Sequence, residues 1–166
     1  MSASGAIIMG VFAAVWWVIG TIASGRAPVL VYGFPILVTG AVIGVGLRSE
    51  RRAAGLAEDE RARRGRLVGI ASGAEGLAIL VAINVLVNMR RIALAAPVVV
   101  IVVGLHFLPL ARWLPARLYY ATSALLVGVG VVGFAIADAD VRRLVVGVGA
   151  ACVLWLTCAV VLSNAR

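Results

Sequence analysis

The sequence predicts an all-α polytopic membrane helix bundle, with six transmembrane helices in a single integral membrane domain over residues 1–166. Of its 166 residues, 63% are hydrophobic and 13% are charged, whereas a soluble domain is nearer half apolar and a quarter charged. The apolar residues form long blocks, and a helix needs roughly 20 residues to cross the hydrocarbon core. Because lipid cannot satisfy open backbone groups, these blocks are expected to be helices. The alternation typical of barrel strands is missing from them.

The first two predicted spans cover residues 6–24 and 28–47. The first is expected to be an uncleaved span, because a signal peptide needs a basic start and a shorter apolar core. Pro35 lies inside the second span and is expected to kink it, since proline removes a backbone hydrogen bond.

Residues 48–66 form the only long polar segment of the sequence. They hold seven Arg and four acidic residues and are expected to be a cytoplasmic Arg-rich loop. Within this segment, Asp59/Arg63 and Glu60/Arg64 have the i,i+4 spacing that supports a short exposed helix.

Short polar segments separate the remaining spans, whose predicted ranges are 67–87, 93–111, 117–136 and 144–163. Residues 88–91 are expected to form the turn between the third and fourth spans. Pro97 is tolerated in the first turns of the fourth span, whereas Pro109 is expected to loosen its end.

Two glycine pairs at i,i+4 spacing predict close approach between helices. Gly40 and Gly44 lie in the second span, and Gly69 and Gly73 lie in the third. Small residues at this spacing let membrane helices pack closely. We therefore expect the protein to form a homo-oligomer through its glycine-rich faces.

The distribution of Arg predicts the orientation in the membrane. All 15 basic residues are Arg, and the formal net charge is +8. They cluster at segment ends and in 48–66, which points to topology and lipid head groups rather than to nucleic acid. With 48–66 inside, both termini are cytoplasmic, ten Arg are inside and five are outside. Arg90 and Arg91 are among the five that oppose the bias.

Two ionisable residues lie inside predicted spans rather than at their ends. Glu75 is about eight residues into the third span, and His106 is about five residues from the end of the fourth. At 1.5 Å per residue, both lie on the order of 8–12 Å deep. Consecutive helices joined by a short turn are usually neighbours, so the two side chains are placed to touch. Ionisable groups within a membrane are costly and tend to be functional, and a Glu–His pair can exchange a proton near neutral pH.

Ser72 and Asn84 are further polar residues of the third span and are expected to orient Glu75 and His106. The alternative is structural. In that interpretation Glu75 is paired, or hydrogen-bonded to Ser72 or Asn84, and stabilises helix packing only. His106 would then be a packing residue, and Asn84 would join helices.

Other chemistry is poorly supported. One His and one buried carboxylate supply two ligands where zinc takes three or four, so neither a metal nor a cofactor is predicted. Cys152 and Cys158 would lie about 9 Å apart along one helix, too far for a disulfide, and are expected to pack. The absence of Lys from the sequence excludes Lys nucleophiles. An enzyme acting on a lipid or solute is the least supported class.

A-E-G at 74–76, Asn84, Pro97 and G-L-H-F-L-P-L at 104–110 carry a resemblance. Over about residues 65–135, the sequence resembles a group of small, uncharacterised bacterial multi-pass membrane proteins with a G-L-H-F-x-P-L motif. The resemblance implies the helix-bundle fold and a membrane location, without an activity. The expected location is therefore the bacterial cytoplasmic (inner) membrane.

Two functions from different classes follow. The first is a proton-coupled carrier or binder of a small solute, with Glu75 and His106 lining a polar cavity that faces the cytoplasm. The second is a non-transporting membrane subunit, sensor or assembly partner. In that case Arg61, Arg63 and Arg64 of the Arg-rich segment would bind the partner.

Overall fold

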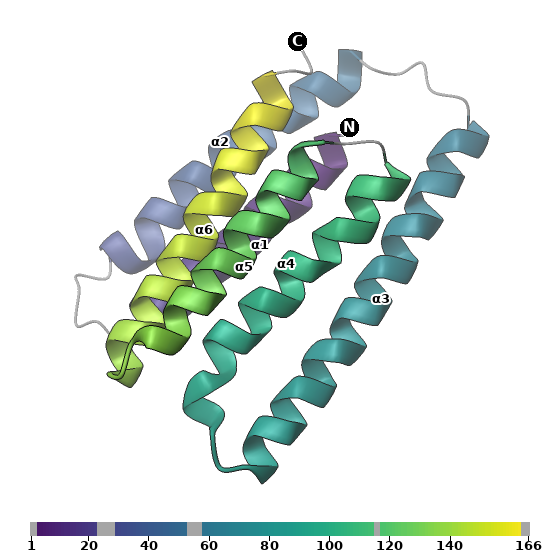
Figure 1. Cartoon of the computed structure of the whole chain (residues 1–166). Helices are drawn as coiled ribbons and strands as arrows, with labels where there is room; N and C mark the ends of the chain where they lie inside the picture. Colours follow the sequence, from purple (N-terminus) through teal and green to yellow (C-terminus); the bar gives the residue numbers. More distant parts are fainter. Residues whose placement is uncertain (1–2, 23–28, 53–57, 115–116, 164–166) are drawn as a thin grey trace. The chain divides into compact units, whose positions relative to one another are not determined.

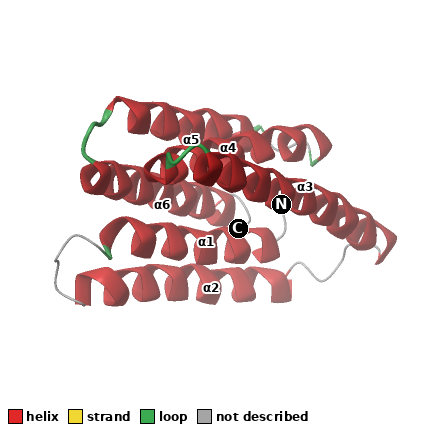
Figure 2. Cartoon of the chain, turned by 90° about the horizontal axis from the view of Figure 1, so that it is seen from below, coloured by secondary structure: helices red, strands yellow, loops and turns green. Residues whose placement is uncertain are grey.

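A computed structural model describes residues 3–22, 29–52, 58–114 and 117–163. These residues form six α-helices and two short helical segments (Figure 1). The helices are α1 (Ala3–Thr21), α2 (Phe34–Arg52), α3 (Glu58–Asn88), α4 (Ala95–Trp113), α5 (Leu118–Ala135) and α6 (Ala139–Ser163). No strand occurs in the described ranges (Figure 2), and the all-α prediction is confirmed.

Five of these helices are long and apolar enough to cross a membrane, and this property is compatible with a multi-pass membrane protein. Their apolar stretches are Val31–Arg48, Gly65–Asn88, Ile92–Trp113, Leu118–Ala135 and Ala139–Ser163. The first of the six predicted spans is the one that falls short of this criterion, because the apolar stretch of α1, Gly5–Thr21, is shorter.

Pro35 disturbs the start of the second span. Val29–Gly33 form a π-helical turn, and α2 begins only at Phe34. Proline has no N–H to donate and its ring crowds the preceding turn of an α-helix, so a wider turn there relieves the conflict. The structure thus has a π-helical turn before α2, and the kink itself stays a prediction.

The described residues of the Arg-rich segment are helical, as the i,i+4 spacing within it favours, where a loop was predicted for the segment as a whole. α2 continues to Arg52, and α3 begins at Glu58. The acidic run at 58–60 is of a type favoured in the first turn of a helix, where the macrodipole is positive. Residues 53–57 lie outside the described residues.

The helix α6 starts at Ala139, earlier than the predicted span at 144–163. The cause is an N-cap formed by Asp138, which belongs to the charged turn before this span. Asp138 Oδ1 accepts hydrogen bonds from the backbone N–H of Asp140 at 3.0 Å and of Val141 at 2.8 Å. An aspartate in this position satisfies donors that have no partner within the helix.

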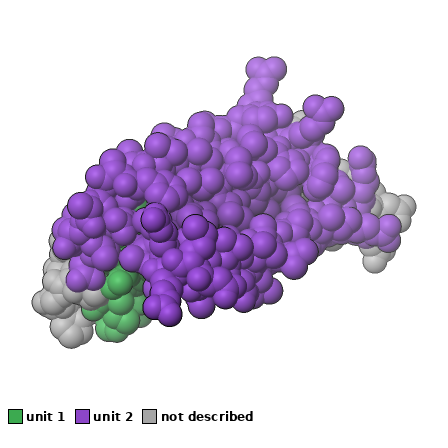
Figure 3. Space-filling view, turned by 60° about the horizontal axis from the view of Figure 1, so that its bottom comes forward, with its two compact units in different colours: residues 1–55, 143–166 green, residues 56–142 purple. Residues whose placement is uncertain are grey.

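The chain divides into two compact units (Figure 3). Unit 1 comprises residues 1–55 and 143–166, and unit 2 comprises residues 56–142. In unit 1, α1 packs against α2, and the part of α6 from Arg143 onward contacts both. In unit 2, α4 packs against both α3 and α5. The single-domain organisation stays a prediction.

Polar side chains inside unit 1 bond across its helices. Cys158 Sγ donates to the carbonyl oxygen of Ala6 at 3.2 Å, and Trp155 Nε1 donates to Thr39 Oγ1 at 3.4 Å. Cys158 is buried and Cys152 is exposed, and both are free thiols. Cys158 is therefore a packing residue that joins α6 to α1.

Two glycines allow α4 and α5 to approach closely in unit 2. A Cβ built on Gly104 would lie 2.9 Å from Val127 Cγ2 and 3.0 Å from Val127 N. A Cβ built on Gly130 would lie 2.8 Å from the carbonyl oxygen of Pro97 and would overlap Ile101. Side chains at these two positions would push the helices apart, so the close packing depends on glycine.

The glycines that the sequence predicts for close packing are not the ones that make these contacts. Gly40, Gly44, Gly69 and Gly73 are exposed, and in the described structure no atom lies within 4 Å of a Cβ built on any of them. Their spacing therefore serves no helix contact among the described residues. Both faces are open to another molecule or to lipid.

Candidate functional site

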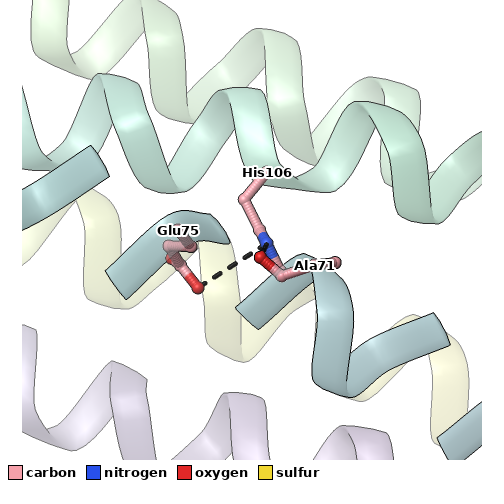
Figure 4. Close-up of polar contacts among 3 residues, drawn as sticks. All are labelled: Ala71, Glu75 and His106. Atoms are coloured by element: carbon pink, nitrogen blue, oxygen red, sulfur yellow. Dashed lines mark hydrogen bonds and ion pairs between the residues drawn. The ribbon is translucent and has the colours of Figure 1, made fainter. Parts of the chain in front are cut away.

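The structure brings Glu75 of α3 and His106 of α4 together (Figure 4). Glu75 Oε2 lies 3.6 Å from His106 Nδ1. The imidazole is nearly buried, with 10% of its side chain exposed, and the carboxylate retains 19%. Both residues belong to stretches that are long and apolar enough to cross a membrane, and the pair spans the seam between these two helices.

The backbone of α3 fixes the orientation of the imidazole. His106 Nδ1 lies 3.2 Å from the carbonyl oxygen of Ala71. A carbonyl oxygen only accepts hydrogen bonds, so Nδ1 carries the proton and donates. Ala71 precedes Glu75 by four residues and shares its face of α3. The Nδ1–H group therefore lies between a carbonyl oxygen and a carboxylate, and Nε2 is the nitrogen left to take up or release a proton.

Aromatic contacts support His106 from within unit 2. The ring of Phe107 lies edge-on to the imidazole, with 5.7 Å between ring centroids. The ring of Phe107 in turn packs against that of Tyr119 of α5, with 5.3 Å between ring centroids. Phe107 and Tyr119 are both buried. Since residues 106 and 107 differ by about 100° around a helix, one side chain faces α3 while the next faces α5.

Pro109 lies three residues after His106 and does not end the helix. α4 continues through Pro109 to Trp113. Proline cannot donate to the carbonyl oxygen of Leu105, the residue that precedes His106. The loosening expected from the sequence is therefore restricted to one missing hydrogen bond beside the site.

Neither of the two predicted orienting residues joins the contact of Glu75 with His106 among the described residues. Asn84 is exposed, and its Nδ2 donates to the carbonyl oxygen of Leu80 on the same helix at 2.8 Å. Asn84 also lies nine residues beyond Glu75, about 13 Å along the axis. Ser72 is exposed. The orienting role of Ser72 and Asn84 stays a prediction.

Small residues surround the carboxylate on α3. Ser72, Gly73, Ala74 and Gly76 flank Glu75 in the sequence, and all four are exposed. They leave the Glu75 side of the pair less covered than the His106 side, in line with the greater exposure of the carboxylate.

The Arg-rich segment is described only in part. Arg63 is exposed and engages in an interaction of its own. The side chains of Arg61 and Arg64 lie outside the described residues. Within the described ranges, no three His, Cys, Asp or Glu side chains gather where they could hold a metal ion.

A further ionisable residue, Arg142, is buried, which the sequence did not predict. Only 8% of Arg142 is exposed, and its guanidinium donates to backbone carbonyls from three parts of unit 2. Nε donates to Gly133 at 3.1 Å and to Ile136 at 3.0 Å, Nη1 donates to Ala93 at 3.1 Å, and Nη2 donates to Ala137 at 3.1 Å.

This guanidinium joins the end of α5 and the start of α6 to the short helical turn Ile92–Leu94, which precedes α4. A cation near the C-terminus of a helix is also favoured by the macrodipole. Nothing in the sequence separates Arg142 from its neighbour Arg143, because both follow the same acidic turn. Only the packing of the helices distinguishes the two, because it buries Arg142 and leaves Arg143 less buried.

In comparisons with protein-family models, with curated proteins and with solved structures, nothing matches this chain. The contact between Glu75 and His106 is therefore the feature of the chain that bears on its function.

Proposed function

We propose that this protein is a proton-coupled carrier or binder of a small solute, and that Glu75 and His106 form its proton-exchanging site. One observation carries the proposal. A carboxylate oxygen and an imidazole nitrogen lie 3.6 Å apart between two helices that are apolar enough to cross a membrane. Ionisable residues in such segments are rare, pair with one another and mark ion or substrate pathways.

The chemistry of the pair suits proton exchange. Nδ1 of His106 keeps its proton because it donates to Ala71, so Nε2 is the titrating atom of the ring. The carboxylate of Glu75 is the second group of the pair that can take up a proton. Protonating Glu75 removes its attraction for the Nδ1–H group, which loosens one contact between α3 and α4. Proton binding would thereby change both the charge that a solute meets and the contact between the helices.

The second candidate function is a non-transporting membrane subunit, sensor or assembly partner. The length of α3 favours it, because this helix has 31 residues where roughly 20 cross a membrane. Its apolar stretch begins at Gly65, so residues 58–64 precede that stretch as helix. In this proposal, Arg61, Arg63 and Arg64 on that extension bind a partner protein.

The proposed setting is a bacterial inner membrane, with both termini and the Arg-rich segment in the cytoplasm. We also propose a homo-oligomer. Its support is that Gly40, Gly44, Gly69 and Gly73 are exposed and have open space where a side chain would be. Glycines at this spacing are typical of helix–helix contacts in membranes.

Proton flux into proteoliposomes tests the carrier proposal. Vesicles that contain a pH-sensitive dye would be challenged with a panel of solute gradients, for the wild-type protein and for Glu75→Gln. We expect solute-dependent flux in the wild type and its loss in Glu75→Gln, because glutamine keeps the shape of the side chain without exchanging a proton.

The matched control is Asp138→Asn, which makes the same acid-to-amide change at the N-cap of α6. Asparagine caps a helix about as well as aspartate, so this variant should fold and keep the flux. If no solute drives proton flux, or if Glu75→Gln transports like the wild type, the carrier proposal is wrong. The second candidate would be favoured if replacing Arg61, Arg63 and Arg64 abolished the binding of a partner protein while Glu75→Gln had no effect.

A further inference from the structure

The turn that ends α3 holds arginine where a different residue is favoured. Arg90 N donates to the carbonyl oxygen of Val87 at 2.9 Å, and Arg91 N donates to that of Leu86 at 2.8 Å. These two bonds are the pattern of a Schellman helix cap, in which Arg90 occupies the left-handed position and Arg91 the position after it. Arg90 has a φ of 56°, in the left-handed region.

Both positions of this cap depart from the usual residue types. Glycine is preferred at the left-handed position because it has no Cβ, and an apolar residue commonly follows it. Arg90 is the only described residue other than glycine with a positive φ. Backbone strain of this kind is concentrated at functional sites, so the arginine side chain is a candidate for a role of its own.

The two arginine side chains are exposed, and no contact within the described residues engages either of them. The other charged side chains at this end of unit 2 already have interaction partners. Arg142 donates to four carbonyl groups, Asp138 accepts two backbone N–H groups, and Asp140 has an interaction of its own. Two guanidinium groups therefore remain available beside the end of an apolar helix.

Apolar side chains flank the pair. Met89 is 60% exposed and Ile92 is 53% exposed, on either side of Arg90 and Arg91. The turn thus presents two cations between two exposed apolar groups, at the point where two apolar stretches end and begin. A phospholipid offers the complementary pattern, because its anionic head group lies directly above acyl chains.

We propose that Arg90 and Arg91 form a binding site for an anionic phospholipid head group, with Met89 and Ile92 against its acyl chains. Arg142 supports the site by holding the carbonyl of Ala93, just after the turn. The proposal also accounts for the pair of arginines that opposes the positive-inside bias in the predicted topology. It is independent of the roles proposed for Glu75 and His106.

Native mass spectrometry of the full-length protein in detergent tests this site. The protein would be titrated with phosphatidylglycerol and with phosphatidylcholine of the same acyl chains. Each of the two arginines of this site should contribute about fivefold to the affinity for an anionic head group that it contacts. The double variant Arg90→Gly with Arg91→Gln should therefore lose roughly 20-fold or more of its affinity for the first phosphatidylglycerol, and keep its affinity for phosphatidylcholine.

The control is Arg112→Gln with Arg117→Gln, which removes two exposed arginines at the other end of α4 and α5. It should bind phosphatidylglycerol like the wild type. Arg90→Gly alone keeps the fold secure, because glycine suits the left-handed cap, and it should lose about fivefold. The proposal is overturned if the wild type binds both lipids equally. It is also overturned if the Arg90/Arg91 variant keeps its affinity, or if the control loses as much.

Discussion

His106 Nδ1 lies 3.2 Å from the carbonyl oxygen of Ala71, so a backbone group of α3 fixes the ring that α4 carries. The same nitrogen lies 3.6 Å from Glu75 Oε2, one helical turn further along α3. The imidazole therefore bridges two groups on one face of the neighbouring helix. Changes to Glu75 and His106 should then affect stability together rather than independently.

A double-mutant cycle measures this coupling. Glu75→Gln, His106→Ala and the double variant would be compared by their free energies of unfolding in detergent micelles. We expect a coupling of about 0.6 kcal/mol, in the range measured for polar contacts between membrane helices. Pairing His106→Ala with Asn84→Ala is the control, and it should be additive because Asn84 bonds to Leu80 on its own helix. Additive effects of Glu75→Gln and His106→Ala would show that the two do not interact.

Gly130→Ala should destabilise the packing of α4 against α5. A Cβ there would overlap Ile101 and lie 2.8 Å from the carbonyl oxygen of Pro97, which cannot move aside like a flexible side chain. We expect a loss of about 1–3 kcal/mol in the free energy of unfolding. Gly128→Ala is the matched control on the same helix, where nothing lies within 4 Å of the new Cβ. It should be neutral or stabilising by up to about 1 kcal/mol, and equal effects of the two substitutions would refute the packing argument.

Arg90→Gly should stabilise the protein in a nonionic detergent without lipid. Arginine in a left-handed conformation costs on the order of 1 kcal/mol relative to glycine, so the melting temperature should rise. Arg90→Val should lower it, because a β-branched residue is least tolerated at positive φ. If Arg90→Gly melts earlier than the wild type, the side chain itself stabilises the folded protein, contrary to the strained-cap interpretation.

Arg142→Met should be among the most destabilising substitutions in unit 2. It would leave the carbonyl groups of Ala93, Gly133, Ile136 and Ala137 without their guanidinium donor. Hydrogen bonds to charged groups are worth roughly 1.5–3 kcal/mol, so we expect a loss of about 3 kcal/mol in the free energy of unfolding.

Arg142→Lys should recover only part of this loss, because an ammonium group cannot reproduce the planar fork of donors. The exposed Arg112 provides the comparison, since Arg112→Met should change stability by about 0.5 kcal/mol or less. An Arg142→Met protein as stable as the wild type would mean that water or other donors satisfy these carbonyl groups equally well.

Composition and segment length were enough to predict the all-helical fold and the approximate helices. The boundaries depended on local contacts that composition does not contain. Asp138 moves the start of α6 forward by capping it, and Pro35 delays the regular part of α2. Periodicity cannot locate such ends, because a cap or a π-helical turn depends on single residues.

For the candidate site too, the sequence identifies the residues but not all of their contacts. Glu75 and His106 could be singled out because each interrupts an apolar block, and the short turn between their helices suggested that they are neighbours. The bond from His106 to Ala71 could not be foreseen, because a sequence does not give the rotation of one helix against another. Arg142 shows the opposite case, since a residue at the end of a span became buried through packing.

The most direct test of the Glu75–His106 site is nitrogen NMR of ¹⁵N-histidine-labelled protein in lipid. The chain has one His, so the spectrum reports on His106 alone. In its neutral form, we predict that the proton is on Nδ1 and that Glu75→Gln shifts the Nδ1 resonance, while Asp138→Asn leaves it unchanged. A proton on Nε2, or an Nδ1 resonance that does not respond to Glu75→Gln, would contradict the account.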